Sequence, residues 1–315
     1  MSVDRAATVA HAERSIARGS RSFGLASRLF DRATRERAWL LYAWCRACDD
    51  LADGQEMGHG MRAVADGAER LVHIRALTAA ALAAEPTGEP AFDALAIVAA
   101  ECSIPQPLCF DLIEGFALDA AGWRPQTAAD LDRYCYHVAG TVGVMMALVM
   151  GVDPGNEAVL DRACDLGLAF QLANIARDVG EDAAAGRCYL PADWLAKEGV
   201  EPGAMMAPHN RPALARLARR LADRAAAHEA SARGGAAALP FRSAWAVLAA
   251  AGIYGGIARG VIRAGETAWD GRVSTSSAAK LGWVVRAGWG ALRRRPPDTP
   301  RPPGLWTRPR QRNPS

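Results

Sequence analysis

Residues 171–191 read QLANIARDVGEDAAAGRCYLP. Good helix formers dominate this stretch up to Gly186, where a helix should end, so we predict one continuous helix before that glycine. Its polar side chains recur at offsets of three, seven and eleven residues and fall within about 80° of one another. They are Gln171, Asn174, Asp178 and Asp182. A helix face of amides and carboxylates is costly to bury without partners, so the pattern indicates binding of something polar and cationic.

A second acidic helix face is predicted within residues 42–53, YAWCRACDDLAD. Its members are Tyr42, Arg46, Asp49, Asp50 and Asp53. Asp49 and Asp53 are four residues apart, the same spacing as the two aspartates of the first face. Like-charged carboxylates at this spacing repel each other, and a divalent cation between them relieves the repulsion.

Oxygen ligands without a neighbouring histidine or cysteine suit Mg²⁺ or Mn²⁺ better than zinc. Because Mg²⁺ is usually bound by one or two carboxylates together with substrate phosphates, we infer that both faces grip a phosphorylated ligand through metal. The expected metal ligands are Asp49, Asp53, Asn174, Asp178 and Asp182. The alternative, a solvated helix face, is the usual explanation for a single D-x-x-x-D pattern. The second copy of the pattern weakens that alternative.

The composition favours a helical enzyme-sized domain. The chain has 315 residues, 50% of them hydrophobic, with a net charge of +3. Alanine is abundant and β-branched runs are short, so we predict an all-α fold. No linker-like change of composition divides residues 1–290, which we expect to form one domain. Residues 291–315 are rich in proline and arginine and are predicted to be disordered. The near-neutral charge of the body shows no nucleic-acid signature.

The sequence also bears on location and on the cysteines. Residues 1–20 lack the apolar core of a signal peptide, and no apolar run reaches the roughly 18 residues of a membrane span, so we expect a cytoplasmic protein. Seven cysteines occur, and Cys45 and Cys48 form a C-x-x-C. A zinc site would need a second such pair, which is absent, so we expect reduced cysteines that pack in the interior.

Four segments resemble the signatures of bacterial phytoene synthases, which belong with the squalene and dehydrosqualene synthases. They are SRSF at 20–23, YAWCRACDDLAD at 42–53, YCYHVAGTVG at 134–143 and the stretch at 171–191. The resemblance runs from about residue 11 to about residue 285. It implies a single-domain helical isoprenoid-synthase fold with a central apolar cavity.

The resemblance implies roles for individual side chains. Near the diphosphate it places the segment with Ser20, Ser22 and Phe23, and also Arg272. Beside the prenyl chains it places Tyr134, Val138, Ala139 and Gly143, and it assigns Tyr254 to the site. The expected catalytic residues are Asp49, Asp53, Asp178, Asp182, Tyr134 and Tyr254.

Other roles follow from residue chemistry and leave alternatives open. Arg46 either forms an intrahelical ion pair with the nearby aspartates or contacts the departing diphosphate. Arg187 follows the second acidic helix and could reach a phosphate, and Gln171 and Asn174 would orient ligand or metal-bound water. Gly140 and Gly143 either open an apolar groove or permit close helix packing.

The resemblance implies an Mg²⁺-dependent prenyltransferase that joins two geranylgeranyl diphosphates head to head. The product, phytoene, would form through a cyclopropyl diphosphate, prephytoene diphosphate, without NADPH. Squalene synthase, the sister enzyme, ends instead with reduction by NADPH. A terpene cyclase usually carries two acidic motifs that differ from each other, and a non-catalytic relative would be expected to lose acidic ligands.

The expected partners follow from the same reaction. They are the prenyl diphosphate substrates, neighbouring carotenoid enzymes and, peripherally, the inner face of the membrane, because substrate and product are both greasy. No nucleic-acid partner is expected.

Overall fold

The structure is a computed structural model that describes residues 4–19, 24, 26–54, 67–295 and 300–310. Within these ranges the chain forms helices and no strand, which confirms the predicted all-α class. Ser20, Ser22 and Phe23 lie outside the described residues, and the Asp53 side chain is likewise not described.

The chain forms two compact units, each described by itself. Unit 1 comprises Met1–Ala121 and Val144–Asn156. Its helices are α1 (Arg5–Gly19), α3 (Arg32–Asp53), α4 (Gly67–Leu82), α5 (Pro90–Cys102) and α6 (Gln106–Ala120). In this unit α3 packs against α1 and α5, and α4 packs against α5 and α6.

Unit 2 comprises Gly122–Gly143 and Glu157–Ser315. Its longer helices are α7 (Ala128–Cys135), α9 (Glu157–Ala184), α10 (Ala192–Glu198), α11 (Arg211–Gly235), α12 (Phe241–Ala264) and α13 (Ser277–Leu292). Its short elements are the π-helix η1 (Tyr136–Gly140) and the 3₁₀ turns η2 (Pro202–Ala204), η3 (Pro208–Asn210), η4 (Ala236–Ala238) and η5 (Gly265–Thr267). The remaining helix, α8 (Thr141–Val149), begins in unit 2 and ends in unit 1.

Helix α3, which carries the first acidic motif, has a clear signal at each end. The Asp31 side chain accepts a hydrogen bond from the Thr34 backbone N–H at 3.0 Å, an N-cap contact. Gly54 ends the helix in the left-handed region at φ 62° and donates its N–H to the Asp50 carbonyl. Trp44 and Cys48 are fully buried. The helix is therefore anchored by its apolar side, which leaves its polar face for other contacts.

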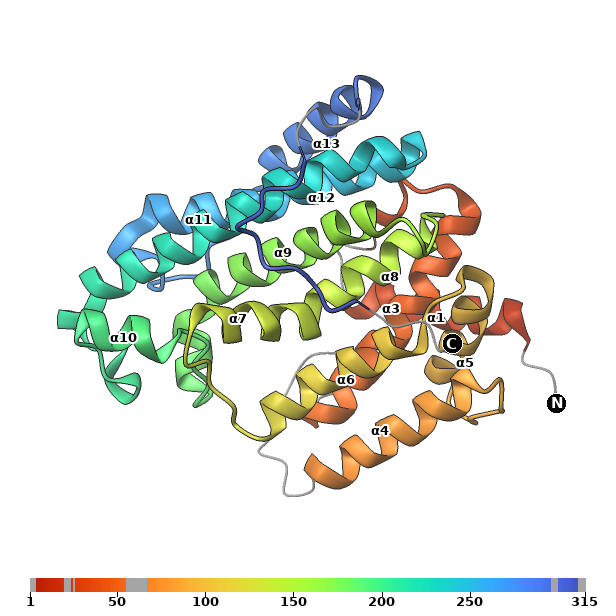
Figure 1. Cartoon of the computed structure of the whole chain (residues 1–315), viewed down its shortest axis with the longest axis horizontal. Helices are drawn as coiled ribbons and strands as arrows, with labels where there is room; N and C mark the ends of the chain where they lie inside the picture. Colours follow the sequence, from red (N-terminus) through yellow and green to blue (C-terminus); the bar gives the residue numbers. More distant parts are fainter. Residues whose placement is uncertain (1–3, 20–23, 25, 55–66, 296–299, 311–315) are drawn as a thin grey trace. The chain divides into compact units, whose positions relative to one another are not determined.

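Helix α9, which carries the second acidic motif, lies at the centre of unit 2. It runs between α12 and α7 and also packs against α11 (Figure 1). The helix stops at Gly186, as predicted. The structure shows that this end is a Schellman motif: Gly186 has φ 75°, and the Arg187 N–H donates to the Asp182 carbonyl at 2.8 Å. The helix therefore terminates one turn after its last ligand candidate.

Three glycines set the spacing between α9 and the segment formed by η1 and the start of α8. A Cβ on Gly143 would collide with the Ala163 carbonyl oxygen, and one on Gly167 would collide with the Ala139 carbonyl oxygen. A Cβ on Gly140 would lie only 2.8 Å from Leu168 Cδ1. Of the two alternatives that the sequence left open, close helix packing is therefore the one observed at these positions.

Residues 300–310 differ from the disorder that we expected for the chain after residue 290. Arg301 binds Asp165 of α9 through two contacts of 2.7 Å, and Arg310 binds Asp161 at 2.6 and 2.8 Å. Trp306 lies against Tyr136 with 5.3 Å between ring centroids. A composition rich in arginine and proline predicts a solvated chain when no partner is known. In the structure, Arg301 and Arg310 bind carboxylates of α9. Helix α13 also extends to Leu292, past the predicted boundary.

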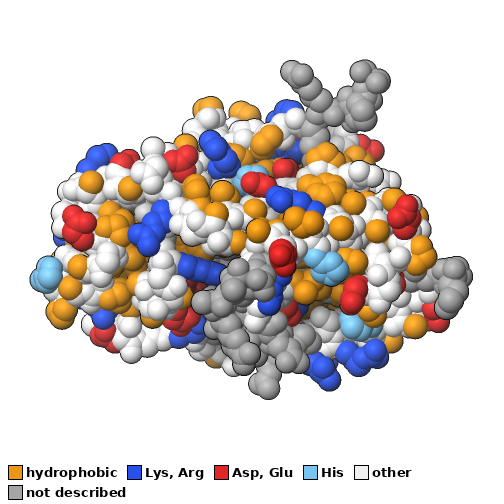
Figure 2. All heavy atoms as spheres, turned by 90° about the horizontal axis from the view of Figure 1, so that it is seen from below, with side chains coloured by type: hydrophobic (Ala, Val, Ile, Leu, Met, Phe, Trp, Pro, Cys, Tyr) orange, Lys and Arg blue, Asp and Glu red, His pale blue; other side chains and the backbone are white. Residues whose placement is uncertain are grey.

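The surface is of mixed character, and one long helix is apolar. On the face shown in Figure 2, acidic, basic and hydrophobic side chains are interspersed, in keeping with the small net charge of +3. Among the described residues one helix, Phe241–Thr267, is long and apolar enough to cross a membrane by length and composition. Of its most apolar window, 44% is buried in the protein, and the finding differs from our expectation that no apolar run reaches the length of a membrane span.

Candidate active site

The acidic face of α3 contains an arginine held by its neighbours. Arg46 Nη1 lies 2.6 Å from Asp49 Oδ2 and 3.9 Å from Asp50 Oδ1, and its guanidinium lies 5.9 Å from the centre of the Tyr42 ring. Burial lowers the pKa of Arg46, but the contact with Tyr42 and the two carboxylates outweighs it, so the pKa is raised. The intrahelical ion pair that the sequence allowed is thus present. All four side chains are half-buried.

Gly19, at the end of α1, makes room for this cluster. A Cβ on Gly19 would collide with the Tyr42 hydroxyl and would lie 3.6 Å from Arg46 Nε. The glycine therefore allows the Tyr42 hydroxyl to approach the end of α1 closely.

The acidic face of α9 is neither buried nor fully exposed. Gln171, Asn174, Asp178 and Asp182 are all half-buried, whereas Leu172, Ala176 and Val179 are buried. This confirms that the polar residues share one accessible side of a helix whose other side lies in the core. Such a partly enclosed polar face is better suited to a ligand than the solvated face considered as the alternative.

Asp178 lies between two guanidinium groups. Arg177 Nε is 2.7 Å from Asp178 Oδ1, and Arg272 Nη2 is 3.4 Å from the same oxygen. Burial lowers the pKa of Arg177, but Asp178, followed by Tyr254 and Glu181, outweighs the burial, and the pKa is raised. Arg272 also binds Glu181 at 2.5 Å. This end of α9 is therefore rich in fixed positive charge beside its carboxylates.

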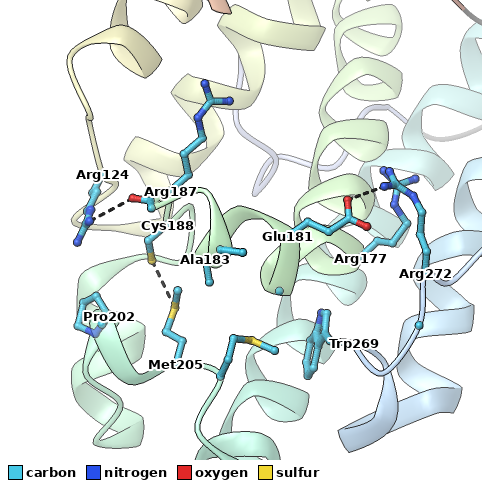
Figure 3. A pocket seen from close by; sticks show the side chains of 16 residues that line it. Arg124, Arg177, Glu181, Ala183, Arg187, Cys188, Pro202, Met205, Trp269 and Arg272 are labelled. Carbon is cyan, nitrogen blue, oxygen red and sulfur yellow. Dashed lines mark hydrogen bonds and ion pairs between the residues drawn. The ribbon is translucent and has the colours of Figure 1, made fainter. Parts of the chain in front are cut away.

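A pocket of about 710 Å³ opens in unit 2 beside the end of α9 (Figure 3). Figure 3 shows Arg177 and Arg272 beside Glu181 at one end, and Arg124 and Arg187 at the other. Met205, Met206 and Trp269 also line the pocket. Because four arginines face a single acidic side chain among the lining residues, the pocket suits an anionic ligand.

Two arginines of the pocket, Arg124 and Arg177, were missed by sequence reasoning. Arg177 is one residue from Asp178, about 100° away around the helix, and therefore does not share the acidic face that the pattern defines. Arg124 lies before α7 and binds the Gly186 carbonyl at 3.4 Å. Arg124 becomes a candidate only in the folded structure, where it lies beside the end of α9. Arg187 and Arg272, which were predicted, line the pocket as well.

Aromatic side chains stack near these elements. Tyr134 lies between Trp123 and Tyr189, with ring centroids 5.6 and 4.9 Å away, and both tyrosines are buried. Tyr254 of α12 stacks on Phe170 of α9 at 4.0 Å. Val138 and Ala139 lie half-buried in η1, a π-helical turn of the kind often found at functional sites.

The donor set fits a hard divalent cation. Within the described ranges, no group of three or more His, Cys, Asp or Glu side chains is arranged to hold a metal. The donors offered by α9 are the carboxylates of Asp178 and Asp182 and the amide of Asn174, all oxygen ligands. Oxygen donors of this kind suit a hard divalent cation.

The chain belongs to the squalene/phytoene synthase family, whose profile matches residues 16–279. Within it, the chain is 48% identical over 302 residues to the phytoene synthase of Pseudescherichia vulneris, covering 95% of this chain and 97% of that protein. The 15-cis-phytoene synthase of Pantoea ananas gives the same identity and coverage. The resemblance predicted from the four motifs is thereby confirmed.

Solved structures agree with this assignment. A dehydrosqualene synthase in complex with ligand is 26% identical to this chain, with a TM-score of 0.80. The superposition covers 90% of this chain and 96% of that chain. The squalene synthase HpnC from Alicyclobacillus acidocaldarius is also 26% identical, with a TM-score of 0.74, and covers 84% of this chain and 97% of its own. The all-α isoprenoid-synthase fold is therefore shared.

Proposed function

We propose that the chain is a prenyltransferase that condenses two geranylgeranyl diphosphates head to head, through prephytoene diphosphate, to phytoene in carotenoid biosynthesis. The observation that carries this proposal is the 48% identity to 15-cis-phytoene synthases across nearly the whole chain. The acidic residues of both motifs are present in this sequence, so the ligands that the reaction needs are available.

The carboxylates of both motifs hold the cation in this proposal, which we take to be Mg²⁺ or Mn²⁺. Its ligands are Asp49, Asp53, Asn174, Asp178 and Asp182. When bound, such a cation neutralises the diphosphate and makes it a better leaving group. Gln171 orients the ligand or its water, and no NADPH takes part.

Arginines bind the diphosphate oxygens in the proposal. Arg177 and Arg272, which both touch Asp178, present guanidinium groups suited to bidentate contacts with phosphate. Arg187 serves the same ligand from the opposite end of the pocket. On α3, Arg46 exchanges part of its ion pair with Asp49 for the leaving diphosphate, and Tyr42 supports it. The segment with Ser20, Ser22 and Phe23 lies outside the described residues, and its part in binding the diphosphate is what the family resemblance implies.

Apolar and aromatic side chains shield the allylic cation from water. Tyr134, Val138, Ala139 and Gly143 line the path of the prenyl chains, and Tyr254 serves the reacting end. Exclusion of water is required because water would quench the cation before the second substrate attacks it. The stacked rings of Trp123, Tyr134 and Tyr189 make this wall rigid.

The remaining parts of the proposal concern organisation and location. Residues 1–290 form the catalytic region, and the protein acts in the cytoplasm with peripheral contact to the inner face of the membrane. Contact with neighbouring carotenoid enzymes would pass the hydrocarbon product onward, because phytoene is insoluble in water.

Product analysis by mass tests the proposal. Purified protein is incubated with Mg²⁺ and either geranylgeranyl or farnesyl diphosphate, with and without NADPH. We expect a C40 hydrocarbon from the C20 substrate, independent of NADPH. A C30 product alone would reassign the chain to the squalene or dehydrosqualene branch, and NADPH dependence would separate those two. No coupled product from either substrate would overturn the proposal.

A further inference from the structure

Helix α13 exposes a continuous apolar stripe. Leu281, Val285, Trp289 and Leu292 are 66%, 65%, 58% and 66% exposed. They are spaced by four, four and three residues, which places them within about 80° of one another on the helix. Large apolar side chains gathered on one outer face mark an interaction site more often than scattered ones do.

The opposite side of α13 is fixed to the rest of unit 2. Ala287 and Ala291 are buried, and Trp245 of α12 donates its Nε1–H to the Val284 carbonyl at 2.7 Å. Trp283 packs so closely on Gly252 that a Cβ there would collide with its ring. Figure 1 shows α13 on the outer side of α12. The helix is therefore held with its stripe outward, and the stripe takes no part in the core.

The charged side chains of α13 and of the three residues after it all have one sign. Residues 277–295 contain Lys280, Arg286, Arg293, Arg294 and Arg295 and no acidic residue. The Arg293 guanidinium lies 4.1 Å from the centre of the Trp289 ring, at the edge of the stripe. An apolar stripe that includes tryptophan and is bordered by cations is the pattern of a helix lying in a membrane interface.

We propose that α13 docks this protein onto an anionic lipid bilayer, with the stripe at the boundary between headgroups and acyl chains. The arginines then lie at the level of the lipid phosphates. Charge favours this occupant over a second copy of the chain, since two copies meeting at α13 would bring five positive charges against five. A surface rich in anionic lipid attracts the same charges. The inference rests on the membrane contact in the proposed function and assigns it to a surface, and it does not depend on which reaction the protein catalyses.

Vesicle co-sedimentation tests this surface. The full chain is mixed with vesicles of phosphatidylcholine alone or of phosphatidylcholine with phosphatidylglycerol, and the partition coefficient is measured. The test variant combines Leu281→Asn, Val285→Asn and Trp289→Asn, positions whose exposure makes them tolerant of polar side chains. Val72→Asn is the matched control, because Val72 of α4 is 65% exposed and lies outside the stripe.

We expect the wild type and the control to bind the anionic vesicles, and the triple variant to bind at least about tenfold more weakly. Arg286→Gln with Arg293→Gln should weaken binding to anionic vesicles and reduce its salt dependence. Equal partition of wild type and triple variant would overturn the proposal. A second outcome would also overturn it: sedimentation shows that the wild type self-associates and the triple variant does not, while neither protein binds vesicles. Activity on detergent-dispersed substrate should be unchanged in the triple variant, which separates this test from that of the reaction.

Discussion

The guanidinium of Arg177 binds the carboxylate of the next residue in the chain, Asp178, with 2.7 Å between Nε and Oδ1. Arg272, 94 residues further along, reaches the same oxygen at 3.4 Å. A carboxylate expected to bind metal is thus already bordered by two cations. In the proposed function, the carboxylate binds the cation and the two guanidinium groups bind the diphosphate.

Asp178→Asn tests the role of this carboxylate. The amide keeps the size of the side chain but removes the charge that attracts a divalent cation. We expect kcat/KM to fall by at least about 100-fold, the scale of losing one electrostatic group at a reacting centre. Steady-state rates with Mg²⁺ and geranylgeranyl diphosphate provide the measurement, and circular dichroism checks the fold.

Glu114→Gln is the matched control for that variant. Glu114 is a half-exposed acid on α6 that pairs with Arg75 at 3.0 Å and has no proposed part in the reaction. Its activity should match wild type. Near-normal activity of Asp178→Asn would remove Asp178 from the proposed ligands.

Arg177→Gln separates phosphate binding from catalysis. Loss of a guanidinium that contacts phosphate removes charge-assisted hydrogen bonds, so we expect the affinity for inorganic pyrophosphate to fall about tenfold or more. Isothermal titration calorimetry with Mg²⁺ measures this without any turnover. Arg177→Lys should restore only part of the affinity, because an ammonium cannot make the bidentate contact. Unchanged pyrophosphate affinity in both variants would limit Arg177 to pairing with Asp178.

The contact between Arg301 and Asp165 should contribute to stability. Asp165 is fully buried and is also bound by His228 Nδ1 at 2.8 Å and by the Ser231 hydroxyl at 2.6 Å. Arg301→Gln leaves this buried carboxylate without its cation, and we expect a loss of about 3 kcal/mol in the free energy of unfolding. Arg310→Gln, which removes a half-exposed arginine from the same segment, should cost less than about 1 kcal/mol. Urea unfolding measures both.

The Arg301 effect should depend on pH in a defined direction. Burial raises the pKa of Asp165, but the contacts with Arg301, His228 and Ser231 outweigh it, so the pKa lies below the ordinary value of 3.8. A depressed carboxyl pKa contributes stability above the unfolded-state value, and that stability is lost as pH falls through the folded-state value. The difference between wild type and Arg301→Gln should therefore be constant near neutrality and shrink below about pH 4. A difference independent of pH would contradict this explanation.

Gly143→Ala tests the close packing of α8 against α9. Its Cβ would meet the Ala163 carbonyl oxygen, a backbone atom that cannot rotate away. We expect a loss of about 1–3 kcal/mol, measured by chemical denaturation. Gly282→Ala in α13, where nothing lies within 4 Å of the added Cβ, should instead be neutral or stabilise by up to about 1 kcal/mol. Equal stability of Gly143→Ala and wild type would show that the helices can separate to admit the methyl group.

Local chemistry made both acidic helices predictable. The period of 3.6 residues places Asp178 and Asp182 on one face whatever the rest of the chain does, and Gly54 and Gly186 end their helices through backbone conformations that glycine adopts readily. The capping pattern before α7 is equally local: Thr127 accepts a hydrogen bond from the Asp130 N–H at 3.3 Å. Helix periodicity and the motif resemblance were therefore enough to predict the all-α class and the family.

Contacts between distant segments were decided by tertiary structure. Arg301 and Asp165 are 136 residues apart, and composition alone predicted disorder for the segment that contains Arg301. Arg272 joins Asp178, and Arg124 joins the end of α9, only because the fold brings their loops there. Sequence periodicity describes one helix at a time. The partner of a charge on another segment depends on how the helices pack, and that packing brings Arg272 to Asp178.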